Sequence, residues 1–186
     1  MDVLNAVFTI INYEDRISFD RFKMGSGFLC EYAWEESEIH VPLQTVDSVE
    51  LYESLKHISS TSTEIMRIVM EMNDIEFNPD NFMLFCILHE VGHFLDHCSR
   101  QVDFLYARFL DECSLKWLQN VVEFDDVLGF IEQYAITKYG RDFVEKFCQE
   151  DEREFAIAIS YRNAVNERSA DKYAADKIKE ILINEQ

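Results

Sequence analysis

The stretch from Asn81 to His97, NFMLFCILHEVGHFLDH, contains two histidines four positions apart in the pattern H-E-x-x-H. On a helix, residues four apart lie on one face, so the side chains of His89 and His93 can converge on one metal ion. Glu90 lies one position further round, where a base must sit to deprotonate a water molecule on that ion. The stretch therefore predicts a helix that carries part of a hydrolytic metal site.

The alternative interpretation is a core helix whose two histidines are satisfied by hydrogen bonds. Apolar residues on most sides indicate that this helix is buried, namely Phe82, Leu84, Phe85, Cys86, Leu88, Val91 and Leu95. Two imidazoles and a carboxylate cost free energy in such a place unless something pairs with them, and a metal ion would do so. A chance H-E-x-x-H is expected on the order of once in a hundred such sequences. Spacing and burial together favour the metal.

A zinc ion in a hydrolytic site usually takes three protein ligands, so a third ligand is expected elsewhere in the chain. His97 continues the series of histidines. However, the straight helix from His89 to His97 is about 12 Å long, too far for ligands that share one ion. We therefore interpret His97 as a structural residue or as one that supports the ligands from behind.

A better third ligand lies in a predicted helix near the carboxyl end, where Glu167 and Asp171 fall on the apolar stripe. The apolar members of that stripe are Ala174, Ile178, Ile181 and Leu182. Carboxylates on a face that points at the core need a cation or hydrogen-bond donors. The functional interpretation is that Glu167 binds the metal, while Asp171 holds the distal N–H of a ligating histidine. The alternative is a pair of acids at the wet margin of the stripe.

The two segments together resemble the ImmA/IrrE-type metallopeptidases, a branch of the zincins whose third ligand is a glutamate. The residues that match the two motifs of the family are His89, Glu90, Gly92, His93 and His97, then Glu167, Ala170, Asp171, Tyr173 and Ala174. The resemblance implies a zincin-like fold and a peptidase that uses Zn²⁺. It also implies a protein or peptide substrate, such as a DNA-binding repressor.

The expected zinc site consists of His89, His93 and Glu167, with Glu90 as the base that accepts the proton of water and delivers it to the leaving amine. A further donor should stabilise the oxyanion. The sequence leaves four candidates for this role, which are Tyr161, Tyr173, His40 and His57.

The rest of the chain predicts one α+β domain over residues 1–186, with strands mainly in 1–45 and helices in 47–186. Strands are expected at 7–11, about 17–22, 28–34 and 39–43, forming a small antiparallel sheet. The alternation around Ile39 and Val41, next to Pro42, predicts a strand near a sheet edge, where an extended peptide could bind near Ile39–Leu43. Helices are expected at 49–58, 65–72, from Asn78 onward through the H-E-x-x-H stretch, and at 102–122, 127–139, 141–148 and 156–183.

The chain is strongly acidic, with a formal net charge of −19 over 186 residues. This charge disfavours direct binding to nucleic acid or to an anionic membrane, because both would be repelled. It permits a basic protein partner. A second class of function is therefore an acidic, zincin-shaped interaction or decoy protein that sequesters a basic partner, with a structural or vestigial metal. Glu90 distinguishes the two classes, because a purely structural site needs no base there.

The cysteines and the amino-terminal segment indicate in which cellular compartment the protein is expected. The five cysteines form an odd set without paired spacing, which indicates reduced thiols. The apolar amino terminus lacks a basic region before it and a cleavage site after it, and no stretch approaches the length of a membrane span. We therefore expect a cytoplasmic protein.

Overall fold

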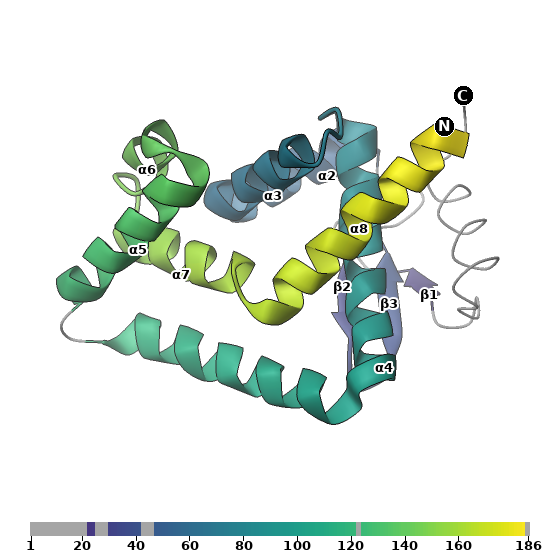
Figure 1. Cartoon of the computed structure of the whole chain (residues 1–186), viewed down its shortest axis with the longest axis horizontal. Helices are drawn as coiled ribbons and strands as arrows, with labels where there is room; N and C mark the ends of the chain where they lie inside the picture. The colour runs from purple at the N-terminus through teal and green to yellow at the C-terminus, as the bar shows by residue number, and fades with distance from the viewer. Residues whose placement is uncertain (1–21, 25–29, 42–46, 122–123, 185–186) are drawn as a thin grey trace.

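The computed structural model describes residues 22–24, 30–41, 47–121 and 124–184 (Figure 1). The strands are β1 (Phe22–Met24), β2 (Glu31–Ala33) and β3 (Glu38–Val41). The helices are α2 (Ser48–Ile58), α3 (Ser60–Met72), α4 (Pro79–Asn120), α5 (Phe124–Tyr139), α6 (Arg141–Phe147), α7 (Glu152–Arg162) and α8 (Val165–Asn184). A small sheet followed by a mostly helical body confirms the α+β class. The strand expected at 7–11 lies outside the described residues.

The described sheet is mixed, which corrects the expectation of an antiparallel one. Its order is β1-β3-β2, with β1 parallel and β2 antiparallel to β3. The prediction that Ile39–Val41 lies at an edge is therefore wrong, because β3 is paired on both sides. Alternating burial reports only which face of a strand meets the core, and Ile39 and Val41 do meet it. Because β3 has no free edge in the described sheet, the peptide-binding edge predicted near Ile39–Leu43 is also wrong as far as Val41. Leu43 itself lies outside the described residues.

Helix α4 begins where its capping residues predict. The side chain of Asn78 accepts a hydrogen bond from the backbone N–H of Asn81 at 2.9 Å, and Pro79 occupies the first turn. The helix is buried from Phe82 to Phe94 apart from Glu90, which is half-buried. It then bends sharply at Gln101, where the backbone leaves helical geometry, and continues as a long arm (Figure 1). The bend matches the predicted boundary between the H-E-x-x-H helix and the helix expected from residue 102.

The packing of α8 against α4 brings the carboxyl-terminal motif to the H-E-x-x-H motif. The helices touch at Gly92, where an added Cβ would lie 2.9 Å from the Cα of Ala170. Only a residue without a side chain allows this approach. A glycine on one helix and an alanine on the other therefore let α8 cross α4 at close range, one turn from Glu167.

Helices α7 and α8 are two elements, which corrects the expected single helix over 156–183. The chain leaves the helix at Asn163, whose amide donates a hydrogen bond to the carbonyl of Ile159 at 2.6 Å. Asparagine competes in this way with the helical hydrogen bonds of the backbone. Because the chain changes direction at this break, the side chain of Arg162 at the end of α7 lies against α8, beside Glu167 and Asp171.

The arm of α4 after the bend leaves an apolar face in solvent. Its exposed large side chains are Val102, Leu105, Tyr106, Phe109, Leu110 and Trp117, whereas Phe104 and Leu118 on the opposite face are buried. Among the described residues, no helix combines the length and the apolar character needed to cross a membrane.

Candidate metal centre

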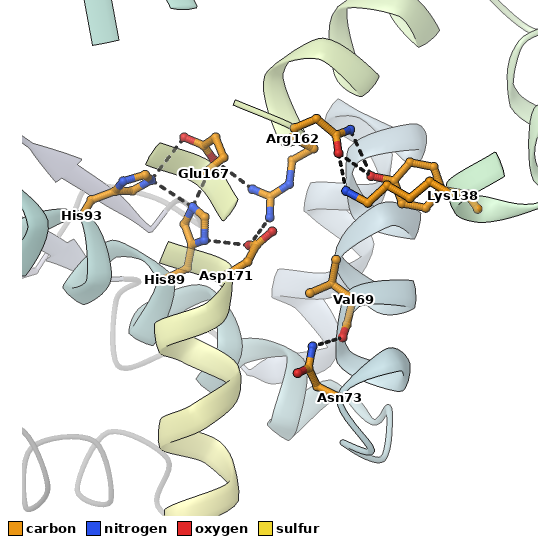
Figure 2. A network of polar contacts seen from close by, with 10 residues as sticks. Val69, Asn73, His89, His93, Lys138, Arg162, Glu167 and Asp171 are labelled. Carbon is orange, nitrogen blue, oxygen red and sulfur yellow. Dashed lines mark hydrogen bonds and ion pairs between the residues drawn. The ribbon is translucent and has the colours of Figure 1, made fainter. Parts of the chain in front are cut away.

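Three side chains from α4 and α8 converge at the crossing of these helices (Figure 2). The Nε2 atoms of His89 and His93 lie 3.0 Å apart. The carboxylate of Glu167 lies 3.1 Å from Nε2 of His89 through Oε2 and 3.2 Å from Nε2 of His93 through Oε1. All three residues are buried, and Glu167 is only 6% exposed. Burial of Glu167 excludes the alternative in which this acid sits at a wet margin.

The three donors fit a tetrahedral zinc ion. Ligand atoms about 2.0 Å from such an ion lie about 3.3 Å from one another. The two imidazole nitrogens are 3.0 Å apart, and each has a different oxygen of Glu167 beside it, at 3.1 and 3.2 Å, so neighbouring donor atoms are spaced close to this value. Two imidazole nitrogens and one carboxylate also form a donor set that zinc prefers, and they leave a fourth position for water. The residues present therefore fit the metal that the sequence predicts.

Asp171 lies behind His89, one turn after Glu167 on α8. Its Oδ1 is 2.9 Å from Nδ1 of His89, the ring nitrogen that points away from the other donors (Figure 2). A carboxylate at this position fixes the ring orientation and the tautomer of a metal-binding histidine. This is the contact that the sequence predicts for Asp171. The Nδ1 atoms of His89 and His93 are both buried, and neither makes a hydrogen bond of regular geometry among the described residues.

Arg162 is a member of the site that the sequence analysis missed. It is 4% exposed, its Nη1 donates to Oε2 of Glu167 at 3.0 Å, and its Nη2 donates to Oδ1 of Asp171. An arginine so deeply buried needs carboxylate partners. The signal was its position in an otherwise apolar run, FAIAISYR from Phe155 to Arg162. The assumption of a continuous helix concealed it, because only the break at Asn163 turns Arg162 back onto α8.

Charges in the metal-free site balance one another. Burial opposes protonation of His89, but its contacts with Asp171 and Glu167 outweigh burial and raise its pKa to about 10. Burial likewise opposes ionisation of Glu167 and Asp171. The two histidines nevertheless hold the pKa of Glu167 well below its ordinary value, and Arg162 together with His89 lowers that of Asp171. Two cations thus face two carboxylates.

Glu90 lies beside the donors and is held by the sheet. Its Oε2 accepts a hydrogen bond from the backbone N–H of Tyr32 on β2 at 2.8 Å. Burial raises the pKa of Glu90, and the neighbouring histidines counteract that rise. A carboxylate with a raised pKa accepts and releases protons closer to neutral pH. The setting therefore suits Glu90 to proton transfer.

His97 is not brought to the donors. Its Nδ1 lies 2.7 Å from the hydroxyl of Tyr32, and its ring stacks on Phe104 with centroids 4.8 Å apart. His97 thus contacts Tyr32, and the backbone of Tyr32 in turn binds Glu90, so His97 supports the site without touching the donors. This arrangement agrees with the interpretation of His97 as a support and not a ligand.

The four candidate donors to the oxyanion lie in different parts of the structure. Tyr161 lies in the last turn of α7, directly before Arg162, and the residue is 40% exposed. Burial of its hydroxyl and the negative charge of Glu167 raise its pKa well above the ordinary value, so it stays protonated. His40 pairs with Glu38 at 3.8 Å, His57 is exposed on α2, and Tyr173 packs against the apolar core. Among these four residues, Tyr161 is the one whose hydroxyl is affected by the charge of a donor residue.

Comparisons of the chain with protein families, with curated proteins and with solved structures found no significant match.

Proposed function

We propose that the chain is a zinc-dependent metallopeptidase with a zincin-like arrangement, which cleaves a peptide bond in a protein substrate. The observation that carries the proposal is the buried triangle of His89, His93 and Glu167, with Glu90 next to it. When bound, zinc supplies a Lewis acid that polarises the scissile carbonyl and lowers the pKa of a water molecule towards about 7.

Glu90 is the proposed base. Its carboxylate accepts the proton of the attacking water and passes it to the amine that leaves. The backbone N–H of Tyr32 fixes one oxygen of this carboxylate, at 2.8 Å, and leaves the other for the proton. Fixing the carboxylate in this way removes rotational freedom that would otherwise be lost during the reaction.

Tyr161 is the proposed donor to the oxyanion. Its raised pKa keeps the hydroxyl protonated at neutral pH, so that it can donate a hydrogen bond where negative charge develops. Replacing Tyr161 by Phe should lower kcat by about 10²–10³-fold and leave zinc affinity unchanged, because removal of one oxyanion donor typically has this effect.

The substrate backbone is proposed to run beside β2. Among the described strands, β2 is paired on one side only, and the N–H on its other side is directed at Glu90. An extended peptide laid along such an edge would pass the base. The family resemblance suggests a DNA-binding repressor as the protein that supplies this peptide.

An acidic interaction or decoy protein is the alternative. The net charge of −19 favours it. It does not account for a half-buried Glu90 that a backbone N–H holds beside the three donors, because a structural metal needs no base. The peptidase explains both the donor triangle and the position of Glu90.

The test uses zinc-loaded protein and a library of peptides derived from a proteome, with cleavage products identified by mass spectrometry. The Glu90→Gln variant should retain zinc and fold yet lose at least about 10²-fold in cleavage rate. The Glu167→Ala variant should lose zinc affinity. Cleavage by Glu90→Gln at the rate of the unchanged protein would refute the proposed mechanism, and unchanged zinc affinity in Glu167→Ala would refute the third ligand.

A further inference from the structure

A cavity of about 310 Å³ lies between the arm of α4 and the end of α7 with the turn that follows it. It is lined by Asp111, Ser114 and Leu115 from α4, by Ser160 and Tyr161 from α7, and by Asn163 and Ala164 from the turn. Tyr161 lines this cavity and directly precedes Arg162, whose guanidinium donates to Glu167 at 3.0 Å, so the cavity adjoins the metal centre. Ligand pockets range from about 300 to 1,000 Å³, so this one suits a single side chain.

Asp111 gives the cavity a carboxylate. No hydrogen bond or ion pair to its carboxylate occurs within the part of the chain that the structure describes, although the residue is half-buried. Arg108, one turn earlier, acts on Asp111 through its charge but makes no ion pair with it: its Nε is 3.6 Å from Glu112, and its guanidinium lies over the ring of Trp34. A half-buried carboxylate in this state favours a cation supplied from outside the protein.

The other walls suit a long side chain with a charged end. Leu115, Ala164 and the ring of Tyr161 offer apolar surface for a methylene stem. The hydroxyl of Ser114 donates its proton to the carbonyl of Leu110 at 2.9 Å, so its oxygen is left as an acceptor. Apolar walls that lead to acceptor oxygens match lysine and arginine, which carry donors only at the end of the side chain.

Asn163 keeps the turn in place. Its Oδ1 accepts hydrogen bonds from the hydroxyls of Tyr134 at 2.7 Å and Tyr139 at 3.2 Å, and from Lys138. Its amide nitrogen donates to Ile159. With both ends of its side chain engaged, Asn163 forms a fixed wall, and Asp111 provides the binding charge.

We propose that this cavity is a specificity pocket that binds a lysine or arginine side chain of the substrate through Asp111, next to the bond that is cleaved. The proposal rests on the proposed peptidase function and adds the class of substrate to it. The negative charge of the whole chain also favours basic substrates, because it attracts basic segments to the protein before they bind.

Binding is tested first, without metal and without cleavage. The probes are N-acetyl-arginine amide and N-acetyl-citrulline amide, which share a shape but differ by one positive charge. Titrations of the full chain followed by NMR should give at least about fivefold tighter binding of the arginine amide, in line with a charge-assisted hydrogen bond. The preference should disappear in Asp111→Asn. It should persist in Glu112→Gln, a matched change at an exposed neighbour outside the cavity.

Cleavage is tested second, with zinc-loaded protein and paired peptides that carry arginine, lysine, citrulline or norleucine on either side of one bond. The ratio of kcat/KM between basic and neutral peptides should be about tenfold and should fall towards one in Asp111→Asn. Equal binding of the two amides, or a preference that survives in Asp111→Asn, overturns the pocket. A charge-selective pocket in a protein that cleaves no peptide overturns the peptidase and leaves the pocket as a binding site.

Discussion

Arg162 donates a hydrogen bond to the same oxygen of Glu167 that lies 3.1 Å from Nε2 of His89. One carboxylate thus faces a guanidinium on one side and the candidate metal on the other. The buried acids of α8 are therefore neutralised before any ion arrives. We expect the fold of the metal-free protein to depend on this cation, and a bound metal would replace the proton that His89 carries.

Replacing Arg162 by Met should destabilise the metal-free protein by about 3–5 kcal/mol, because it leaves buried carboxylates without their partner. Zinc should restore part of this loss by neutralising Glu167. Urea unfolding with and without zinc measures both effects. The control is Arg67→Met, which removes ion pairs to Glu64 and Glu71 near the surface of α3 and should cost less than about 1 kcal/mol. Equal stability of the two variants would contradict the role given to Arg162.

Replacing Gly92 by Ala should push α8 away from α4, because the new Cβ would lie 2.9 Å from the backbone of Ala170. Overpacking of this kind costs about 1–3 kcal/mol, and zinc affinity should fall with it because Glu167 moves with α8. Gly129→Ala on α5 is the control, since its Cβ meets nothing within 4 Å. That change should stabilise the helix by about 0.5–1 kcal/mol. If Gly92→Ala binds zinc as the unchanged protein does, the close crossing is not what aligns the donors.

Replacing Asp171 by Asn should reduce zinc affinity by about 10–100-fold, because the ring of His89 loses the carboxylate that orients it. Competition with a chelator measures the affinity. Asp176→Asn, on the same helix but in an exposed pair with Lys172, should leave the affinity unchanged. An equal affinity in both variants would remove Asp171 from the site.

Zinc binding should depend on pH through His89. A pKa of about 10 means that His89 is protonated in the metal-free protein at pH 8. Zinc requires the neutral ring, so binding releases about one proton. The affinity should therefore rise about tenfold per pH unit between pH 7 and 9, as the competing proton becomes scarcer. Calorimetry in buffers with different enthalpies of ionisation counts the protons, and a release near zero would contradict the raised pKa.

The two helices that carry the donors could be predicted because their signals are local. Spacing places His89 and His93 on one face, and the burial of Glu167 and Asp171 follows from their place on an apolar stripe. The meeting of these helices was inferred from chemistry, since buried acids need a cation. No periodicity gives the angle or the contact of two helices. In the structure, the contact comes from Gly92 and Ala170.

The errors have one physical origin, which is that long-range pairing leaves little trace in short patterns. Ile39 and Val41 alternate in burial equally well in a central strand and at an edge, so β3 was misplaced. Arg162 was missed because the side chain of Asn163 ends the helix, an outcome that depends on local competition for hydrogen bonds. Hydrophobic periodicity alone continues through that break.

The chain between His93 and Glu167 runs through the arm of α4 and through α5, α6 and α7. Closing such a long loop is slow, although its entropic cost grows only with the logarithm of its length. The two histidines need only one turn of helix to come together, whereas their glutamate partner comes from a helix beyond all of these elements. We therefore expect a metal ion to gain its full set of ligands only once α8 has packed against α4, so that its capture would report a late stage of folding.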